Sequence, residues 1–296
     1  MLTNNCSLCP RECFVDRSIN AGACGSTNRI KVARATLHMW EEPCISGDRG
    51  SGTVFFSGCP LHCVYCQNRK ISDGSVGKEL SVAELADTFI DLQNKGAHNI
   101  NLVTPTHYIH QIREAIIMAK KSGLIIPIVY NTGGYEKVES LKLLSGLIDI
   151  YLPDLKYFSM EVARKYSNAP NYFEVALKAI NEMYEQVGVA TFDEEGLMTK
   201  GVIIRHLLLP GLLEDSKKII KKVYEMFGDN VYLSIMNQYT PMQGIGEKFP
   251  ELADKVSEED YDALVDYAIE IGVENGFIQE GETASESFIP DFYEDW

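Results

Sequence analysis

Three cysteines, Cys59, Cys63 and Cys66, form a C-x3-C-x2-C run within the segment GCPLHCVYCQN (58–68). Thiolates at this spacing are typical ligands of an iron–sulfur cluster or of zinc. A structural metal site uses four protein ligands, whereas three ligands leave one coordination position open, as catalytic metal sites do. The run therefore predicts a metal centre that can bind a further molecule. The alternative is a zinc site completed by His62.

A second group of cysteines, Cys6, Cys9, Cys13 and Cys24, has the spacing C-x2-C-x3-C-x10-C. Four thiolates can close a metal site, so we expect either zinc or a second iron–sulfur cluster here. Disulfide frameworks are typical of small secreted chains, which makes metal the preferred reading in a chain of 296 residues. Cys44 either replaces one of the four ligands or is a buried thiol.

The composition excludes several classes of protein. The chain carries 42 acidic and 27 basic residues, a formal net charge of −15, which argues against nucleic acid as a partner. No apolar run reaches the roughly 20 residues that span a bilayer, and the first residues lack the pattern of a signal peptide. We expect a soluble, cytoplasmic protein without membrane contact.

From residue 53 onward, short β-branched or apolar runs alternate with amphipathic segments, and Ser81 with Glu84 forms a capping box. The predicted strands are 53–57, 99–103, 126–131, 148–153, 202–208 and 231–236. The predicted helices are 81–95, 107–121, 172–186, 214–227 and 258–272. Repeated β–α units without a dinucleotide-binding fingerprint predict an α/β fold, a partial (β/α)6 TIM-like barrel.

We predict three regions along the chain. Residues 1–50 form a small cysteine-rich metal-binding lobe, because they show little periodicity. Residues 51–245 form the partial barrel. Residues 246–296 form an acidic C-terminal helix and tail, with 16 acidic residues and two lysines from Glu247 onward. We interpret this acidity as a solvated helix face.

The three-cysteine loop follows the first predicted barrel strand, and Tyr65 directly precedes its last cysteine. In this context the motif resembles the radical S-adenosylmethionine (SAM) superfamily. The extension CQN resembles pyruvate formate-lyase activating enzymes. The longer run HMWEEPCISGDRGSGTVFFSGCPLHCVYCQN is similar to uncharacterised iron–sulfur proteins homologous to them.

The resemblance implies that Cys59, Cys63 and Cys66 hold a [4Fe–4S] cluster whose open iron binds SAM. Reductive cleavage of SAM would then give methionine and a 5′-deoxyadenosyl radical that abstracts a hydrogen atom. The implied partners are a flavodoxin or ferredoxin as electron donor and a small-molecule, peptide or protein substrate. A glycine of a glycyl radical enzyme is one such substrate.

Members of the superfamily usually carry Gly-Gly-Glu after the second strand, where this chain has Thr104-Pro105-Thr106-His107. The hydroxyls of Thr104 and Thr106 can assist backbone carbonyls in binding the methionine ammonium group. His107 is a candidate for binding a carboxylate or exchanging protons with a substrate, and its alternative is an ordinary residue in the first turn of a helix.

Polar residues also end the later strands. Asn131 stands where the resemblance implies contact with the ribose hydroxyls, and Asp154 with Lys156 can bind a carboxylate or form an ion pair. Arg205 is expected to point into the barrel and bind a carboxylate. The remaining predicted cofactor contacts are Tyr65 and Gln238, and His38, Glu41 and Glu42 line the substrate side or form a salt-bridged loop.

Overall fold

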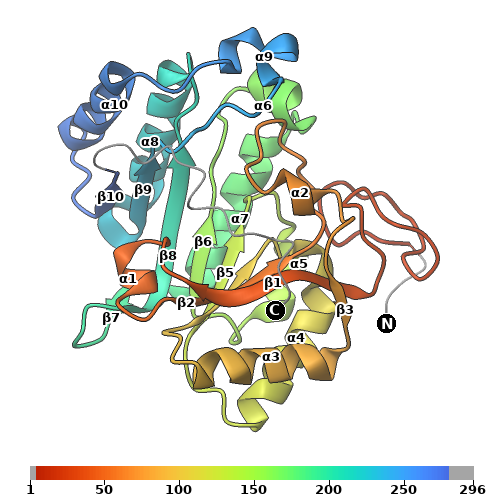
Figure 1. Ribbon diagram of the computed structural model, residues 1–296. Helices are drawn as coiled ribbons and strands as arrows, with labels where there is room; N and C mark the ends of the chain where they lie inside the picture. Colours follow the sequence, from red (N-terminus) through yellow and green to blue (C-terminus); the bar gives the residue numbers. More distant parts are fainter. Residues whose placement is uncertain (1–4, 280–296) are drawn as a thin grey trace.

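The computed structural model describes residues 5–279, and a ten-stranded sheet forms its centre (Figure 1). Parallel strands follow the order β10-β9-β8-β6-β5-β4-β2, and β1, β3 and β7 are antiparallel to their partners. The parallel strands are β2 (Ser51–Phe56), β4 (Ile100–Val103), β5 (Ile128–Thr132), β6 (Ile150–Pro153), β8 (Met198–Leu207), β9 (Tyr232–Met236) and β10 (Gly276–Ile278). Within residues 5–279, β3 and β10 are the two edges, so the sheet is open and the expected partial barrel is confirmed.

The long helices agree with the periodicity of the sequence. They are α3 (Val82–Asn94), α4 (Ile109–Lys121), α7 (Tyr172–Val187), α8 (Leu213–Phe227) and α10 (Glu258–Glu270). The predicted capping box is present, because Ser81 accepts from the backbone N–H of Glu84 while the Glu84 carboxylate accepts from that of Ser81. Shorter helices are α1 (Pro43–Ser46), α2 (Arg69–Ser72), α5 (Val138–Leu141), α6 (Met160–Ser167) and α9 (Ile245–Lys248).

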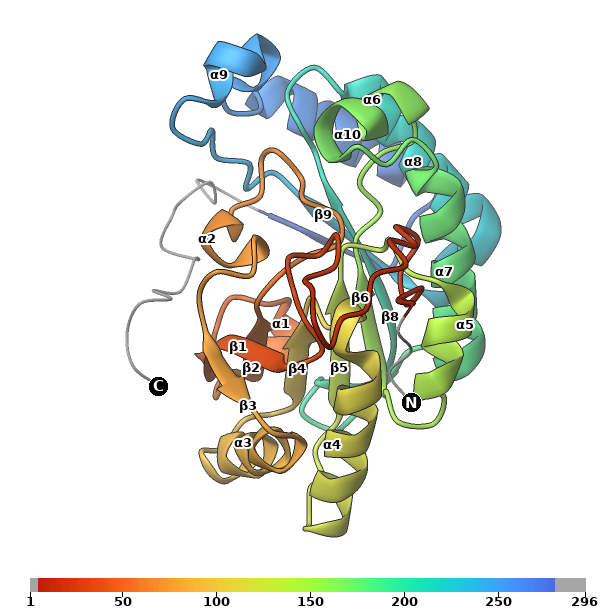
Figure 2. The same cartoon turned by 90° about the vertical axis from the view of Figure 1, so that its right-hand side faces the viewer.

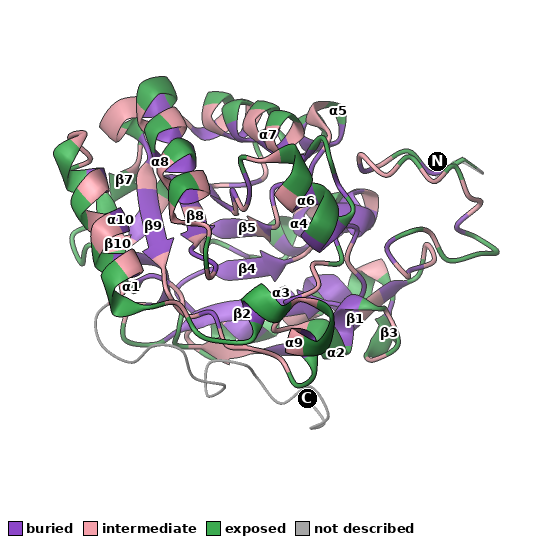
Figure 3. Ribbon diagram, turned by 90° about the horizontal axis from the view of Figure 1, so that it is seen from above, coloured by how far each residue is buried: buried purple, intermediate pink, exposed green. Residues whose placement is uncertain are grey.

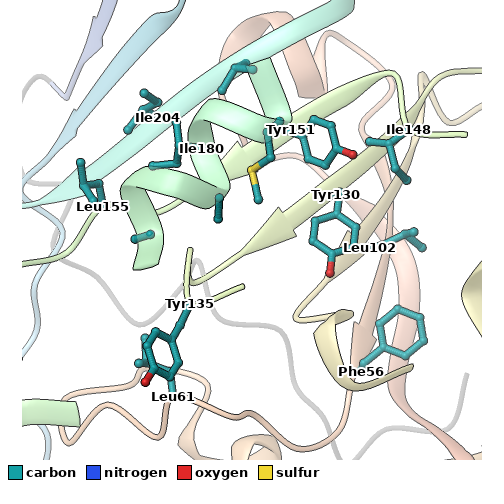
Figure 4. Packing of buried hydrophobic residues seen from close by; sticks show 14 of the residues in the cluster. Phe56, Leu61, Leu102, Tyr130, Tyr135, Ile148, Tyr151, Leu155, Ile180 and Ile204 are labelled. Atoms are coloured by element: carbon teal, nitrogen blue, oxygen red, sulfur yellow. The ribbon is translucent and has the colours of Figure 1, made fainter. Parts of the chain in front are cut away.

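Side-chain alternation gives the sheet two different faces. Tyr130 and Tyr151, from neighbouring strands, point toward the helices, where they pack with their ring centroids 5.8 Å apart beside Ile180 of α7 (Figure 4). Val129 and Ile150 point the other way and pack with residues of α1. Figure 3 shows the central strands β2, β4 and β5 as buried and the outward sides of the helices as exposed. None of the helices in the described chain is long and apolar enough to cross a membrane.

Four strands of the described chain were not among those predicted: β1, β3, β7 (Thr191–Phe192) and β10. β1 (Ile30–His38) lies inside the region expected to be an irregular lobe, and it pairs with β2 and with β3 (Lys78–Leu80). Lys31 and Arg34 interrupt its apolar residues, which weakens the strand signal in the sequence. β10 has only three residues, and its strand partner β9 is distant in sequence. Of the region predicted as a tail, residues 280–296 lie outside the described residues.

The irregular part of the N-terminal region is therefore residues 5–29, which we call the cysteine lobe. Figure 2 shows it as dark red loops between α2 and α7. Hydrogen bonds attach it to the barrel, including one from Ser140 Oγ in α5 to the carbonyl of Leu8 (2.7 Å). Strand β7 (Thr191–Phe192) is not part of this lobe and forms a hairpin with β8.

Candidate functional site

The loop that carries Cys59, Cys63 and Cys66 begins directly after β2, at the carboxyl end of the parallel strands. Gly58 starts it with φ +88°, and a Cβ at this position would lie 2.1 Å from Ser26 Oγ and 2.6 Å from the carbonyl of Cys24. Only glycine fits such a close approach. The backbone N–H of Cys66 then donates to the carbonyl of Cys63 (3.1 Å), which closes a tight turn. The fold thus presents three thiols on one compact loop.

Each of the three thiols lies in an environment with donors or positive charge. The backbone N–H of Leu61 donates to Cys59 Sγ (3.4 Å), and Ser167 Oγ donates to Cys63 Sγ (3.1 Å). Burial raises the pKa of Cys59 to about 11 and that of Cys66 to about 12, while the charge of Lys156 acts in the opposite direction on both. Hydrogen-bond donors and a nearby cation suit the electron-rich sulfurs of a thiolate-bound cluster.

Lys156 lies at the carboxyl end of β6, where it forms an ion pair with Asp154 (Nζ to Oδ2, 2.5 Å). Burial opposes its charge, but Asp154 holds the pKa of Lys156 well above its usual value. The hydroxyl of Tyr172 accepts from the Lys156 N–H (3.0 Å) and lies 2.9 Å from the carbonyl oxygens of Asp154 and Gly133. Tyr172 therefore fixes the ends of β5 and β6 against each other.

The glycines after β5 bring this strand end to the cysteine loop. A Cβ on Gly134 would lie 2.2 Å from the carbonyl of Asp154, and one on Gly133 would contact both Leu61 (3.3 Å) and Lys156 (3.7 Å). The predicted residues at these strand ends therefore share one edge of the sheet. The residues of this edge that stay partly exposed are Cys59, Cys63, Cys66, Thr104, Asn131, Asp154 and Lys156.

Thr104 shows unusual backbone geometry, with φ +58°. This left-handed conformation is strained for a β-branched residue and is found mainly where function requires it. Its N–H donates to the carbonyl of Asn131 (2.9 Å), so the ends of β4 and β5 are held together.

His107, which the sequence analysis offered as a candidate for binding a carboxylate or exchanging protons, is enclosed within the protein. Its side chain is buried, and its Nε2 donates to the carbonyl of Ser57 (2.8 Å). Burial, together with the nearby charge of Arg17, lowers the pKa of His107 to about 3. The ring is thus neutral, and we assign it a structural role beneath the cysteine loop.

Thr106 is also engaged inside the protein, by a residue that the sequence analysis missed. The hydroxyls of Thr106 and Thr132 both donate to Oε1 of Glu136 at 2.5 Å. Glu136 is 1% exposed, and burial raises its pKa to about 7. The sequence signal for Glu136 was its position two residues after the glycine pair of NTGGYE. A buried turn needs polar partners for its backbone and hydroxyl groups, and an acidic residue at this position can supply them.

Glu136 makes the stability of the fold depend on pH. Its pKa is raised on folding, so the folded chain keeps a proton that the unfolded chain releases between about pH 4.5 and pH 7. The contribution of Glu136 to the free energy of unfolding is therefore complete below pH 4.5, and it falls by about 3 kcal/mol as the pH rises to 7. We expect urea unfolding of Glu136→Gln to lack this component. The exposed Glu139→Gln is the control for lost charge, and equal pH slopes for wild type and Glu136→Gln would contradict the assignment.

The guanidinium of Arg205, which the sequence analysis expected to bind a carboxylate, is already paired within the protein. It forms ion pairs with Glu41 and Glu42, and Nε lies 2.8 Å from Glu42 Oε1. Asn101 Nδ2 donates to the second oxygen of Glu41 (2.7 Å). Arg205 is therefore not available to a substrate carboxylate in this structure. Of the two alternatives for Glu41 and Glu42, the contacts match the salt-bridged loop.

Tyr65 and Gln238 connect the cysteine loop to the far side of the sheet. The Tyr65 ring is buried and makes edge contacts with the rings of Tyr157, Tyr166 and Tyr239 at 6.2–6.3 Å. Gln67 Nε2 donates to the carbonyl of Gln238 (2.8 Å), after β9. Tyr65 thus anchors the loop through its ring.

Across residues 5–279, no group of three or more His, Cys, Asp or Glu side chains is arranged to hold a metal ion as it stands. All eight cysteines are free thiols. A separate groove of about 530 Å³ lies between α5, α7 and α8, lined by Val138, Leu177 and Met226 among others. It contains none of the strand-end residues, so the carboxyl edge of the sheet remains the candidate site.

The open, mostly parallel sheet with three cysteines after its first parallel strand defines a class of protein. A family model described as the radical SAM superfamily matches residues 53–223, more than half of the chain. The chain therefore belongs to the radical SAM superfamily, and the predicted resemblance is confirmed. Membership implies a [4Fe–4S] cluster and SAM as cofactors.

The chain is also similar to a relative in sequence and to solved structures in fold. An uncharacterised protein of Methanocaldococcus jannaschii is 29% identical over 276 residues, which cover 89% of this chain and 74% of that protein. Streptococcus suis SuiB bound to S-adenosylmethionine has a similar fold, with a TM-score of 0.52 and 15% identity over 76% of this chain. SuiB bound to its precursor peptide SuiA gives a TM-score of 0.53 and 14% identity over 75% of this chain. The chain spans about half the length of SuiB, 49% and 46% in the two structures.

Proposed function

We propose that this protein is a radical SAM oxidoreductase that uses Cys59, Cys63 and Cys66 to hold its [4Fe–4S] cluster and abstracts hydrogen from a peptide or protein substrate. The observation that carries the proposal is the convergence of three strand ends on the cysteine loop, through Gly133 and Lys156. This places polar, partly exposed groups beside the three thiols at the edge where such barrels carry their chemistry.

The chain's own residues have distinct roles in this proposal. Lys156 and Asp154 set the charge beside the thiolates, and the backbone N–H of Leu61 stabilises the sulfur of Cys59. Asn131 supplies an amide for the ribose hydroxyls, and Thr104 presents backbone groups from its strained conformation. A cluster held by Cys59, Cys63 and Cys66 would supply, when reduced, the electron for the reductive cleavage of SAM by which this superfamily abstracts hydrogen.

The positions of His107 and Arg205 favour a peptide or protein substrate over a small anion. A small anionic substrate would need basic groups, but His107 is buried and neutral and Arg205 is paired with Glu41 and Glu42. Lys156 is engaged by Asp154. A backbone segment carries no net charge and is compatible with these pairings. In line with the CQN motif, we propose a glycine of a partner enzyme as the target, with flavodoxin or ferredoxin as electron donor.

SAM cleavage tests the proposal. Anaerobically reconstituted protein, reduced by flavodoxin or dithionite, is expected to release 5′-deoxyadenosine. Deuterium should enter this product from a glycyl radical partner made with Cα-deuterated glycine. Deuterium transferred only from a pool of metabolites would instead indicate a small-molecule substrate. A full cluster without cleavage under either reductant would overturn the enzymatic proposal in favour of an electron-transfer or scaffolding protein.

A further inference from the structure

The cysteine lobe, residues 5–29, has no apolar core of its own. Its larger apolar side chains Phe14 and Ile19 are 54% and 75% exposed. The side chains that it buries include three of its cysteines, Cys6, Cys9 and Cys24. A segment of this length without regular structure buries too little apolar surface to order itself, and natural proteins cross-link such segments by disulfides or metal. Since its thiols are free, a metal is the remaining cross-link.

Tight turns bring the four cysteines of the lobe toward one another. The backbone N–H of Cys6 donates to Val15 (2.9 Å), and that of Phe14 donates to Cys6 (3.0 Å), so the two ends of the first loop lie side by side. A Cβ on Gly22 would lie 3.3 Å from Cys13 Sγ and 3.5 Å from Cys24 Sγ. The thiols of Cys6 and Cys13 both act electrostatically on Cys24.

Cys9 belongs to the same group and lies beside a buried acid. Its thiol is within electrostatic range of Cys6 and Cys24 and also of Glu136. Among the described residues, Oε2 of Glu136 has no hydrogen-bond partner. A buried carboxyl group with an unpaired oxygen near the thiol of Cys9 is an environment that a metal cation would neutralise.

The lobe also holds the loop of Cys59, Cys63 and Cys66 in place. The carbonyl of Cys24 accepts from the N–H of Cys59 (3.0 Å). Arg11 donates to the carbonyls of Pro60 (2.7 Å) and Leu61 (3.1 Å) in that loop. The same guanidinium donates to the carbonyls of Ser167 (2.6 Å) and Asn168 (2.5 Å) at the end of α6. A single side chain from the lobe thus joins the cysteine loop to the barrel.

We propose that Cys6, Cys9, Cys13 and Cys24 bind a thiophilic metal centre, a zinc ion or a second iron–sulfur cluster, and that this centre positions the loop of Cys59, Cys63 and Cys66 through Arg11 and Cys24. The metal orders the lobe, and the ordered lobe fixes two peptide groups next to Cys59. Arg11 is a positioning residue, because it contacts the loop and not the cofactors. This site is independent of the proposed substrate.

Metal analysis of the full chain, purified anaerobically from a host supplied with iron and zinc, tests the site. We expect one zinc per chain, or more than four irons per chain after reconstitution. The double variant Cys9→Ser/Cys13→Ser should lose this excess, while Cys44→Ser, which removes a buried thiol outside the lobe, should keep it. Wild-type protein with four irons and no zinc would overturn the site, as would a double variant with unchanged metal content.

The coupling has a separate readout, the rate at which a chelator removes iron from the four-iron cluster. Arg11→Ala should keep the metal of the lobe but release cluster iron about 10–100-fold faster, because removing groups that orient metal ligands lowers metal affinity by about that factor. Arg11→Lys, which retains the charge but not the forked donors, should fall between Arg11→Ala and wild type. An iron-release rate in Arg11→Ala equal to that of wild type would overturn the coupling and leave the metal site to the test above.

Discussion

Replacing Cys63 with alanine is expected to remove the [4Fe–4S] cluster and reduce 5′-deoxyadenosine release below detection. Only three thiols lie on the loop after β2, so loss of one leaves a cluster with two protein ligands. Ser167, which donates to Cys63 Sγ, would lose its acceptor but cannot replace the ligand from its place in α6. The variant should therefore lose both the electron paramagnetic resonance signal of the reduced cluster and SAM cleavage.

Cys44→Ala is the matched control for this variant. Cys44 is also a mostly buried thiol, but it packs with Ile45 and Val129 on the other face of the sheet. It should keep the resonance signal and the cleavage rate. A Cys63→Ala protein with a wild-type signal and rate would contradict the ligand assignment, and loss of both properties in Cys44→Ala would show that the assay reports folding instead.

Replacing Lys156 with methionine is expected to destabilise the fold and make the cluster harder to reduce. The pair of Lys156 and Asp154 is mostly buried, with side chains 16% and 21% exposed. Removing the cation leaves the Asp154 carboxylate unpaired, which costs about 3 kcal/mol in the free energy of unfolding. Loss of a positive charge near Cys59 and Cys66 also favours the oxidised cluster, because the reduced cluster is more negative.

A double variant separates the two effects of Lys156. Asp154→Asn/Lys156→Met removes both charges of the pair and should regain most of the lost stability. Lys217→Met, on the surface of α8, is a control whose ion pair with Glu214 contributes under about 1 kcal/mol. Urea unfolding gives the stability and a redox titration gives the potential. Wild-type values of both in Lys156→Met would refute the charge role.

Local sequence determined the elements and the ligand loop of this protein. The helices repeat their apolar residues every three to four positions, and the six predicted strands are apolar runs, so both signals lie within one short segment. The spacing of Cys59, Cys63 and Cys66 is likewise a local property, and it identified the superfamily. Strand β10, with three residues, was too short for such a signal, and β1 was obscured by its basic residues.

The partners of the polar residues were decided by the tertiary structure. Arg205 lies 163 residues from Glu42 in the chain, and Thr106 lies 30 residues from Glu136, yet these buried contacts change the roles expected of Arg205 and Thr106. The hydrogen-bond partner of a buried polar group depends on which strands become neighbours in the sheet. Local sequence spacing does not show which strands are neighbours, so it does not show these partners either. Arg11, 157 residues from Asn168, owes its place against the cysteine loop to the same cause.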